Sequence, residues 1–209
     1  MRATSVMRFV VFGAVGFGIG WAIAGFLTSG FLALTLPKFQ PPAPPPPWWV
    51  TWPPYFAYFL AGTCGGAGLG LAIGGWKRVV ALAVAGGMGF GVSFFLYFVV
   101  AFLFGLPVVG IAVGVGLFGG ASLGLTFGVW KRVMLLGLAG MVGFGVGGAI
   151  ATAVGMPPLP ANWEHPPLWL ALYVPVQAVV GLIGGASLGA GLGYLENRKQ
   201  AAERRPKVR

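Results

Sequence analysis

The sequence predicts an all-α, polytopic integral membrane protein with six transmembrane helices, arranged as three parallel two-helix repeats with glycine-zipper packing. The first observation is composition, because 57% of the 209 residues are hydrophobic and only 8% are charged, with a mean hydropathy of +0.89. A water-soluble chain of this length needs far more charge to cover its surface. The second is a regular alternation of long apolar runs with basic or proline-bearing connections, and the third is the recurrence of two glycine motifs.

Charge and proline divide the chain into six candidate spans, each long enough to cross a hydrocarbon core about 30 Å thick. The spans are residues 9–36, 55–76, 79–106, 108–130, 133–155 and 168–195. Glycine-rich apolar segments stay helical in a bilayer because the backbone has no other hydrogen-bond partner there. We therefore expect residues 1–209 to form a single transmembrane domain, with residues 196–209 as a basic cytoplasmic tail.

The connections between the spans alternate in charge. Lys77-Arg78, Lys131-Arg132 and the carboxyl-terminal segment are basic, whereas the intervening connections carry proline and almost no charge. Of all Lys and Arg residues, only Lys38 lies on the side of the proline-bearing connections. Because positive residues in short loops stay in the cytoplasm, we expect both termini on the cytoplasmic side of the cytoplasmic (inner) membrane.

The second, fourth and sixth spans carry glycines at a strict spacing of four. These residues are Gly62, Gly66, Gly70, Gly74, Gly116, Gly120, Gly124, Gly128, Gly181, Gly185, Gly189 and Gly193. Residues four apart share one helix face, so each stripe presents bare backbone to a neighbour. We expect the stripes to be helix-packing contacts at which Leu is destabilising and Ala is tolerated, as in Gly124→Ala. The alternative is that the stripes hold a flat ligand such as a lipid, a carotenoid or a quinone.

Two motifs recur in alternate spans. Gly-Gly-Ala-(Gly or Ser)-Leu-Gly begins at Gly65, Gly119 and Gly184, and Gly-x-x-Gly-Phe-Gly-(Val or Ile) begins at Gly13, Gly86 and Gly140. Two spans separate each copy of a motif from the next, so all copies of one type cross in the same direction. This arrangement predicts a pseudo-threefold axis along the membrane normal.

Residues that carry chemistry are sparse. No ionisable residue lies centrally in a proposed span, which argues against a proton-coupled pump. The only histidine, His165, stands beside Glu164 without further ligands, and Cys64 has no second cysteine, so we predict neither a catalytic nor a metal site. Pro175 and Gln177 form a candidate polar site in the sixth span. The interpretation that the pattern favours is that Gln177 only bridges two helices beside an ordinary proline kink.

The pattern favours a non-catalytic scaffold, assembly factor or accessory subunit of a membrane complex, and not an enzyme. The net charge of +10 is dispersed between the spans, so it indicates membrane topology and not a nucleic-acid partner. The expected partners are the lipid bilayer and other membrane subunits, and no cofactor is predicted. The alternative is a small transporter or channel for an uncharged or weakly polar solute, because three hairpins can surround an axial pathway. In style the chain resembles glycine-rich multi-pass bacterial membrane proteins, a resemblance that supplies no functional residue.

Overall fold

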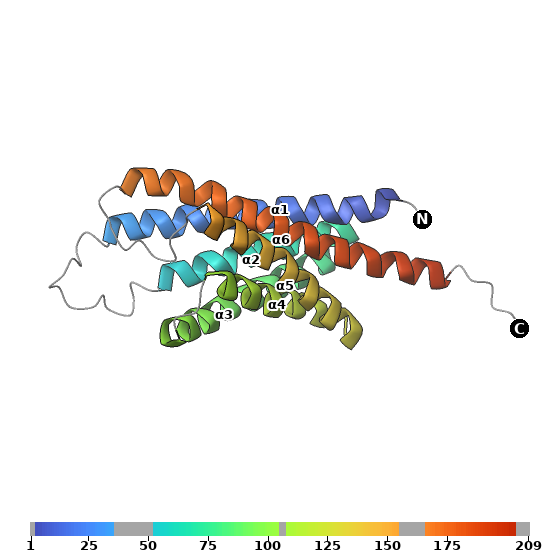
Figure 1. Cartoon of the computed structure of the whole chain (residues 1–209). Coiled ribbons are helices and arrows are strands. Elements are labelled where there is room, and N and C mark those ends of the chain that lie inside the picture. Colours follow the sequence, from blue (N-terminus) through green and yellow to red (C-terminus); the bar gives the residue numbers. More distant parts are fainter. Residues whose placement is uncertain (1–2, 36–51, 105–107, 155–165, 204–209) are drawn as a thin grey trace, which may run out of the picture.

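The computed structural model describes residues 3–35, 52–104, 108–154 and 166–203, whose regular structure is entirely α-helical. The helices are α1 (Ala3–Thr35), α2 (Trp52–Ile73), α3 (Trp76–Phe104), α4 (Val108–Leu125), α5 (Trp130–Ala153) and α6 (Pro166–Glu203). They run back and forth along one common direction, and α1 begins at the same end of the molecule as α6 finishes (Figure 1). We call this the terminal end and the other the opposite end.

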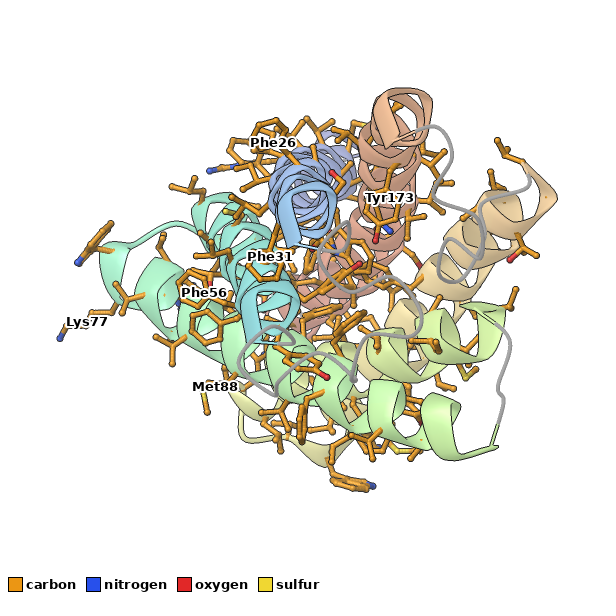
Figure 2. The ribbon with its side chains drawn as sticks, turned by 90° about the vertical axis from the view of Figure 1, so that its left-hand side faces the viewer. Phe26, Phe31, Phe56, Lys77, Met88 and Tyr173 are labelled. Carbon is orange, nitrogen blue, oxygen red and sulfur yellow. The ribbon has the colours of Figure 1, made fainter. Side chains whose placement is uncertain are left out.

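The described helices form a closed ring. Consecutive helices pack against each other, and α1 packs against α6. Figure 2 looks into the ring from the opposite end and places Phe26, Phe56 and Met88 on its outside and Tyr173 on the inner side of α6. Those three outer side chains are 64%, 61% and 55% exposed. An apolar exterior of this kind suits contact with lipid and not with water.

Most of the described helices are long enough to span a membrane. Five of them, α1, α2, α3, α5 and α6, meet the length and apolarity that a crossing requires, whereas the apolar stretch of α4, Val109–Leu125, is shorter. Seventeen residues rise about 26 Å, slightly less than the roughly 30 Å hydrocarbon core, a mismatch that a bilayer accommodates by local thinning. The prediction of an all-helical chain of multi-pass character is confirmed.

Two helices end earlier than the sequence predicted. α2 ends at Ile73 and not at residue 76, and α4 ends at Leu125 and not at residue 130. The cause is backbone conformation, because Gly74, Gly75 and Gly128 adopt φ values of +89°, +92° and +64°. Glycine adopts this left-handed conformation readily, and it commonly terminates a helix. The tryptophans at the predicted span ends therefore begin the following helices, α3 and α5.

The last helix is longer than predicted. α6 continues to Glu203, so the first part of the expected tail is helical. Near the terminal end, the Glu196 carboxylate lies 3.6 Å from the guanidinium of Arg132, at the start of α5. The guanidinium of Arg198 lies 5.2 Å from the ring centroid of Tyr194, one helical turn earlier. These are partly exposed interactions, which individually stabilise a fold only slightly.

Three phenylalanines meet at the centre of the ring. Phe17 of α1, Phe90 of α3 and Phe144 of α5 are the phenylalanines of the three recurring Gly-x-x-Gly-Phe-Gly motifs. Their ring centroids are 5.0 Å, 5.1 Å and 5.7 Å apart in the three pairings, and no side chain of the three is more than 1% exposed. Their tilted and edge-on geometries are those that aromatic pairs prefer. We call this cluster the phenylalanine triangle.

Each ring of the triangle lies on a glycine of the next helix. Phe17, Phe90 and Phe144 cover Gly65, Gly119 and Gly184 respectively, so closely that an added Cβ would overlap the aromatic carbons. One turn nearer the terminal end, the equivalent residues Leu69, Leu123 and Leu188 are all completely buried. The centre of the ring is therefore filled by two successive layers of apolar side chains.

Replacing one member of the triangle should destabilise the protein strongly. We expect Phe144→Ala to cost about 3 to 5 kcal/mol, because the neighbouring rings and backbone cannot collapse fully onto the missing side chain. The matched control is Phe26→Ala, at a position 64% exposed, which should change stability little. Unfolding in mixed micelles measures both variants, and equal stability of the two would contradict a close-packed centre.

Candidate functional site

The predicted glycine stripes lie at the contacts between helices. In three pairs, the glycine of one helix faces the carbonyl of a glycine on its neighbour: Gly62 and Gly86, Gly116 and Gly140, Gly185 and Gly13. Further along the same faces, a Cβ added at Gly70 or Gly124 would stand 2.5 Å from the Cα of Val79 or Val133. Ten of the twelve predicted glycines face the adjacent helix in this way. Backbones meet here without intervening side chains.

Gly74 and Gly128 do not contribute to these contacts, and for them the prediction is wrong. An added Cβ at either residue would meet nothing within 4 Å. Both continue the four-residue spacing, but they lie beyond the helices whose faces they were expected to extend. The Gly74 N–H donates to the carbonyl of Gly70 at 2.9 Å, and the Gly128 N–H donates to that of Leu125 at 3.0 Å. These two glycines terminate helices and bring the chain into the next one.

The contact between α6 and α1 differs in register from its two counterparts. In the recurring motif, Gly181 corresponds to Gly62 and Gly116, yet it faces the carbonyl of Phe17, and it is Gly185 that faces Gly13. The α6–α1 pair is therefore displaced by four residues, which is one helical turn or about 6 Å. Short turns join α2 to α3 and α4 to α5 and fix their register. No such turn joins α6 to α1.

Serine hydroxyls link the other set of neighbours. Ser122 of α4 donates to the carbonyl of Ala85 in α3 at 3.0 Å, and Ser187 of α6 donates to that of Ala139 in α5 at 2.7 Å. The equivalent residue of α2 is Gly68, where a Cβ would stand 2.5 Å from a carbonyl oxygen of α1. A side chain at this third position would separate α1 from α2. Gly therefore stands in place of Ser at position 68, where α1 and α2 approach too closely for a side chain.

The two residues of the predicted polar site point in different directions. Gln177 is 8% exposed and packs on α1. A Cβ added at Gly25 of α1 would lie 3.1 Å from the Cβ of Gln177. Pro175 is exposed, on the other side of α6. Two positions along a helix turn by about 200°, so these neighbours in sequence cannot share one face. The structure retains Gln177 as a buried polar residue and separates Pro175 from it.

Other polar side chains gather around Gln177. The hydroxyl oxygens of Tyr58 and Tyr173 are 3.4 Å apart, and either can donate, and Tyr173 also interacts with the Gln177 side chain. The ring of Trp21 lies edge-on to Tyr58, with a centroid distance of 5.2 Å. We call Trp21, Tyr58, Tyr173 and Gln177 the polar cluster. It joins α1, α2 and α6 at the opposite end of the ring.

Sequence reasoning missed three members of the polar cluster. One signal was present, because Tyr58 and Gln177 each stand four residues before the first glycine of a stripe, at Gly62 and Gly181. Each of the two therefore lies on the same helix face as the glycine stripe that follows it. Tyr173 gave no signal of its own, since an aromatic residue near the start of an apolar run usually indicates the membrane interface. Trp21 lies near the middle of its predicted span, where a buried indole N–H needs a partner, and this signal was overlooked.

The described residues contain no group of three or more His, Cys, Asp or Glu side chains that is arranged to hold a metal ion. Glu164 and His165 lie outside the part of the chain that the structure describes. Cys64 is a free, half-buried thiol on α2. The features that remain for function are the packed glycine faces, the apolar exterior and the polar cluster.

Long apolar helices, close backbone contacts inside and large apolar side chains outside together define a multi-pass helical membrane protein. The chain matches no protein-family model, no curated protein and no solved structure.

The glycine contacts revise the expected effect of alanine. Because a Cβ at Gly124 would stand 2.5 Å from the Cα of Val133, Gly124→Ala should already separate α4 from α5, at a cost of about 1 to 3 kcal/mol. The control is Gly30→Ala in α1, where a Cβ would meet nothing within 4 Å. That change should be neutral or stabilise the helix by up to about 1 kcal/mol. Thermal denaturation in detergent compares the two, and a tolerated Gly124→Ala would contradict the close contact.

Proposed function

We propose that the chain is a six-span, non-catalytic membrane protein that serves as a scaffold, assembly factor or accessory subunit of a membrane complex. The observation that carries this proposal is the phenylalanine triangle, whose side chains are at most 1% exposed. An axial transport path would have to pass three rings with centroids only 5.0 to 5.7 Å apart. With its centre filled, the molecule offers its apolar outer surface to other membrane subunits.

The proposed architecture is three copies of a two-helix unit held by glycine-zipper packing. It is supported by contacts that recur at positions made equivalent by the motifs, namely a phenylalanine on a glycine and a glycine on a carbonyl. The shortest helix, α4, belongs to the scheme because Gly116 and Gly124 meet α5 as Gly62 and Gly70 meet α3. We assign the stripes to helix packing and not to a lipid, carotenoid or quinone, since neighbouring backbone covers ten of the twelve glycines.

The proposed orientation places the terminal end in the cytoplasm, with the protein in the cytoplasmic membrane. In support, Arg8, Lys77, Arg78, Lys131 and Arg132 stand near helix ends on that side of the ring. Positive residues are retained on the cytoplasmic side of bacterial membranes, and anionic lipid headgroups attract them. The basic residues of α6 beyond its apolar part extend the same surface.

A second candidate function is a small transporter or channel for an uncharged or weakly polar solute. The polar cluster favours it, because buried polar side chains inside a membrane protein commonly mark a solute site. The phenylalanine triangle lies between this cluster and the terminal end and opposes passage along the axis. We therefore rank transport below the scaffold role.

Thiol labelling tests the orientation. In a Cys64→Ser background, cysteines at Ala43 and Ala161, both outside the described residues, should react in intact cells with an impermeant thiol reagent. A cysteine at Ala202, in the exposed last turn of α6, should react only after the cells are permeabilised. Labelling of the Ala202 position in intact cells would reverse the proposed orientation.

Purification and flux together test the scaffold role. From native membranes in a mild detergent, the tagged chain should elute with a partner subunit at fixed stoichiometry. Proteoliposomes containing the purified chain should pass urea and glycerol no faster than protein-free liposomes, because the axis is filled. Isolation as a single species that accelerates either flux, with the acceleration lost in a denatured control, would replace the scaffold proposal by the transporter.

A further inference from the structure

The polar cluster occupies a defined level of the ring. Trp21 follows Phe17 by one turn of α1, so the indole lies on the opposite-end side of the phenylalanine triangle. Its ring contacts that of Phe144 with a centroid distance of 5.1 Å, and Tyr58 stacks on Phe94 at 3.7 Å. The cluster thus lies next to the triangle on its opposite-end side and packs against aromatic rings. Viewed from the opposite end, Tyr173 is seen on the inner side of α6 (Figure 2).

Two polar atoms of the cluster have no hydrogen-bond partner. They are the indole nitrogen of Trp21 and the side-chain oxygen of Gln177, on side chains only 5% and 8% exposed. Such an atom loses its bonds to water on burial, and almost all buried polar atoms in native proteins recover them from a partner. One of these atoms can only donate and the other can only accept.

Of the hydroxyl groups near the cluster, some are satisfied by their own helix, whereas that of Thr28, seven residues after Trp21 on the same face of α1, is buried without a partner. The hydroxyl of Ser29 donates to the carbonyl of Gly25 at 2.6 Å, and that of Thr63 donates to the carbonyl of Phe59 at 2.9 Å. Hydroxyls can return to their own helix in this way, whereas an indole and a long amide cannot. The Gln177 side chain interacts with Tyr173 of its own helix, and its oxygen has no partner on a neighbouring helix.

We propose that the polar cluster binds a small uncharged ligand that carries both a hydrogen-bond donor and an acceptor, of the primary carboxamide class. A carboxamide oxygen would accept from the Trp21 indole, and its NH₂ group would donate to the Gln177 oxygen. The residues packed around the cluster, Gly25, Phe94 and Phe144, are apolar. A charged ligand would lose its hydration there without a counter-charge, so the ligand is neutral.

The site binds its ligand without passing it through the protein. The phenylalanine triangle blocks the way towards the terminal end, so entry and exit both occur on the opposite-end side. This inference is independent of the scaffold proposal, which rests on the triangle and not on the cluster. Failure of butyramide binding would leave the filled axis and the scaffold proposal unchanged, and an open axis would change the route of the ligand but not the binding residues.

The probe for this site is butyramide, and N,N-dimethylbutyramide, which accepts but cannot donate, is its matched control. Saturation-transfer NMR on the purified full-length chain in detergent should show saturable binding of butyramide, at least tenfold tighter than that of the dimethyl compound. Equal affinities for the two, or no saturable binding of butyramide, would overturn the proposal without any variant.

Variants then test whether Trp21 and Gln177 form the binding site. Trp21→Phe removes the donor and keeps an aromatic ring, and Gln177→Leu removes the acceptor, so each should weaken butyramide binding tenfold or more. Trp76→Phe, an exposed indole at the start of α3 (77% exposed), should leave it unchanged. Undiminished binding by a folded Trp21→Phe variant would overturn the assignment. So would an experimental structure in which the Trp21 indole donates to the Gln177 oxygen.

Discussion

Helices in a bilayer gain little by covering one another's apolar side chains, because lipid tails are as apolar as leucine. Their association then depends on how closely the backbones can approach, since van der Waals attraction falls steeply with distance. In this protein the approach is set by missing side chains, with glycine facing glycine at pairs such as Gly62 and Gly86. The triangle depends on the same condition. Its aromatic rings fit only because Gly65, Gly119 and Gly184 leave the volume that they occupy.

Much of the fold could be predicted from the sequence because the constraints are local. Long apolar runs must be helical in lipid, and a four-residue glycine spacing identifies the face that meets a neighbour. The ends of the helices were less predictable. Gly74 and Gly128 continue the spacing of their stripes, yet they adopt positive φ and end the helical path. Spacing alone does not distinguish a glycine within a face from one that terminates it.

The candidate site was less predictable than the fold, because it depends on contacts between distant segments. Gln177 was identified as polar, but two other members of the polar cluster, Trp21 and Tyr58, lie on helices more than a hundred residues away in sequence. The motif Gly-Phe-Gly was visible three times without indicating that its phenylalanines converge. The one-turn displacement of α6 against α1 also has no local signature. It arises where no short connection imposes a register.

The contact between α1 and α6 joins the first and last of the described helices, which gives assembly a direction. Chains enter the membrane from the amino end, so α1 is present with its Gly13 face bare while the other helices are still being made. α1 can pack against α2 early, but its Gly13 face acquires its partner, α6, last. Until then, α6 of a second molecule would fit the same face, which is the condition under which identical chains exchange elements. Closure of the ring is thus a competition between the chain's own last helix and that of a neighbour, and crowding in the membrane would shift its outcome.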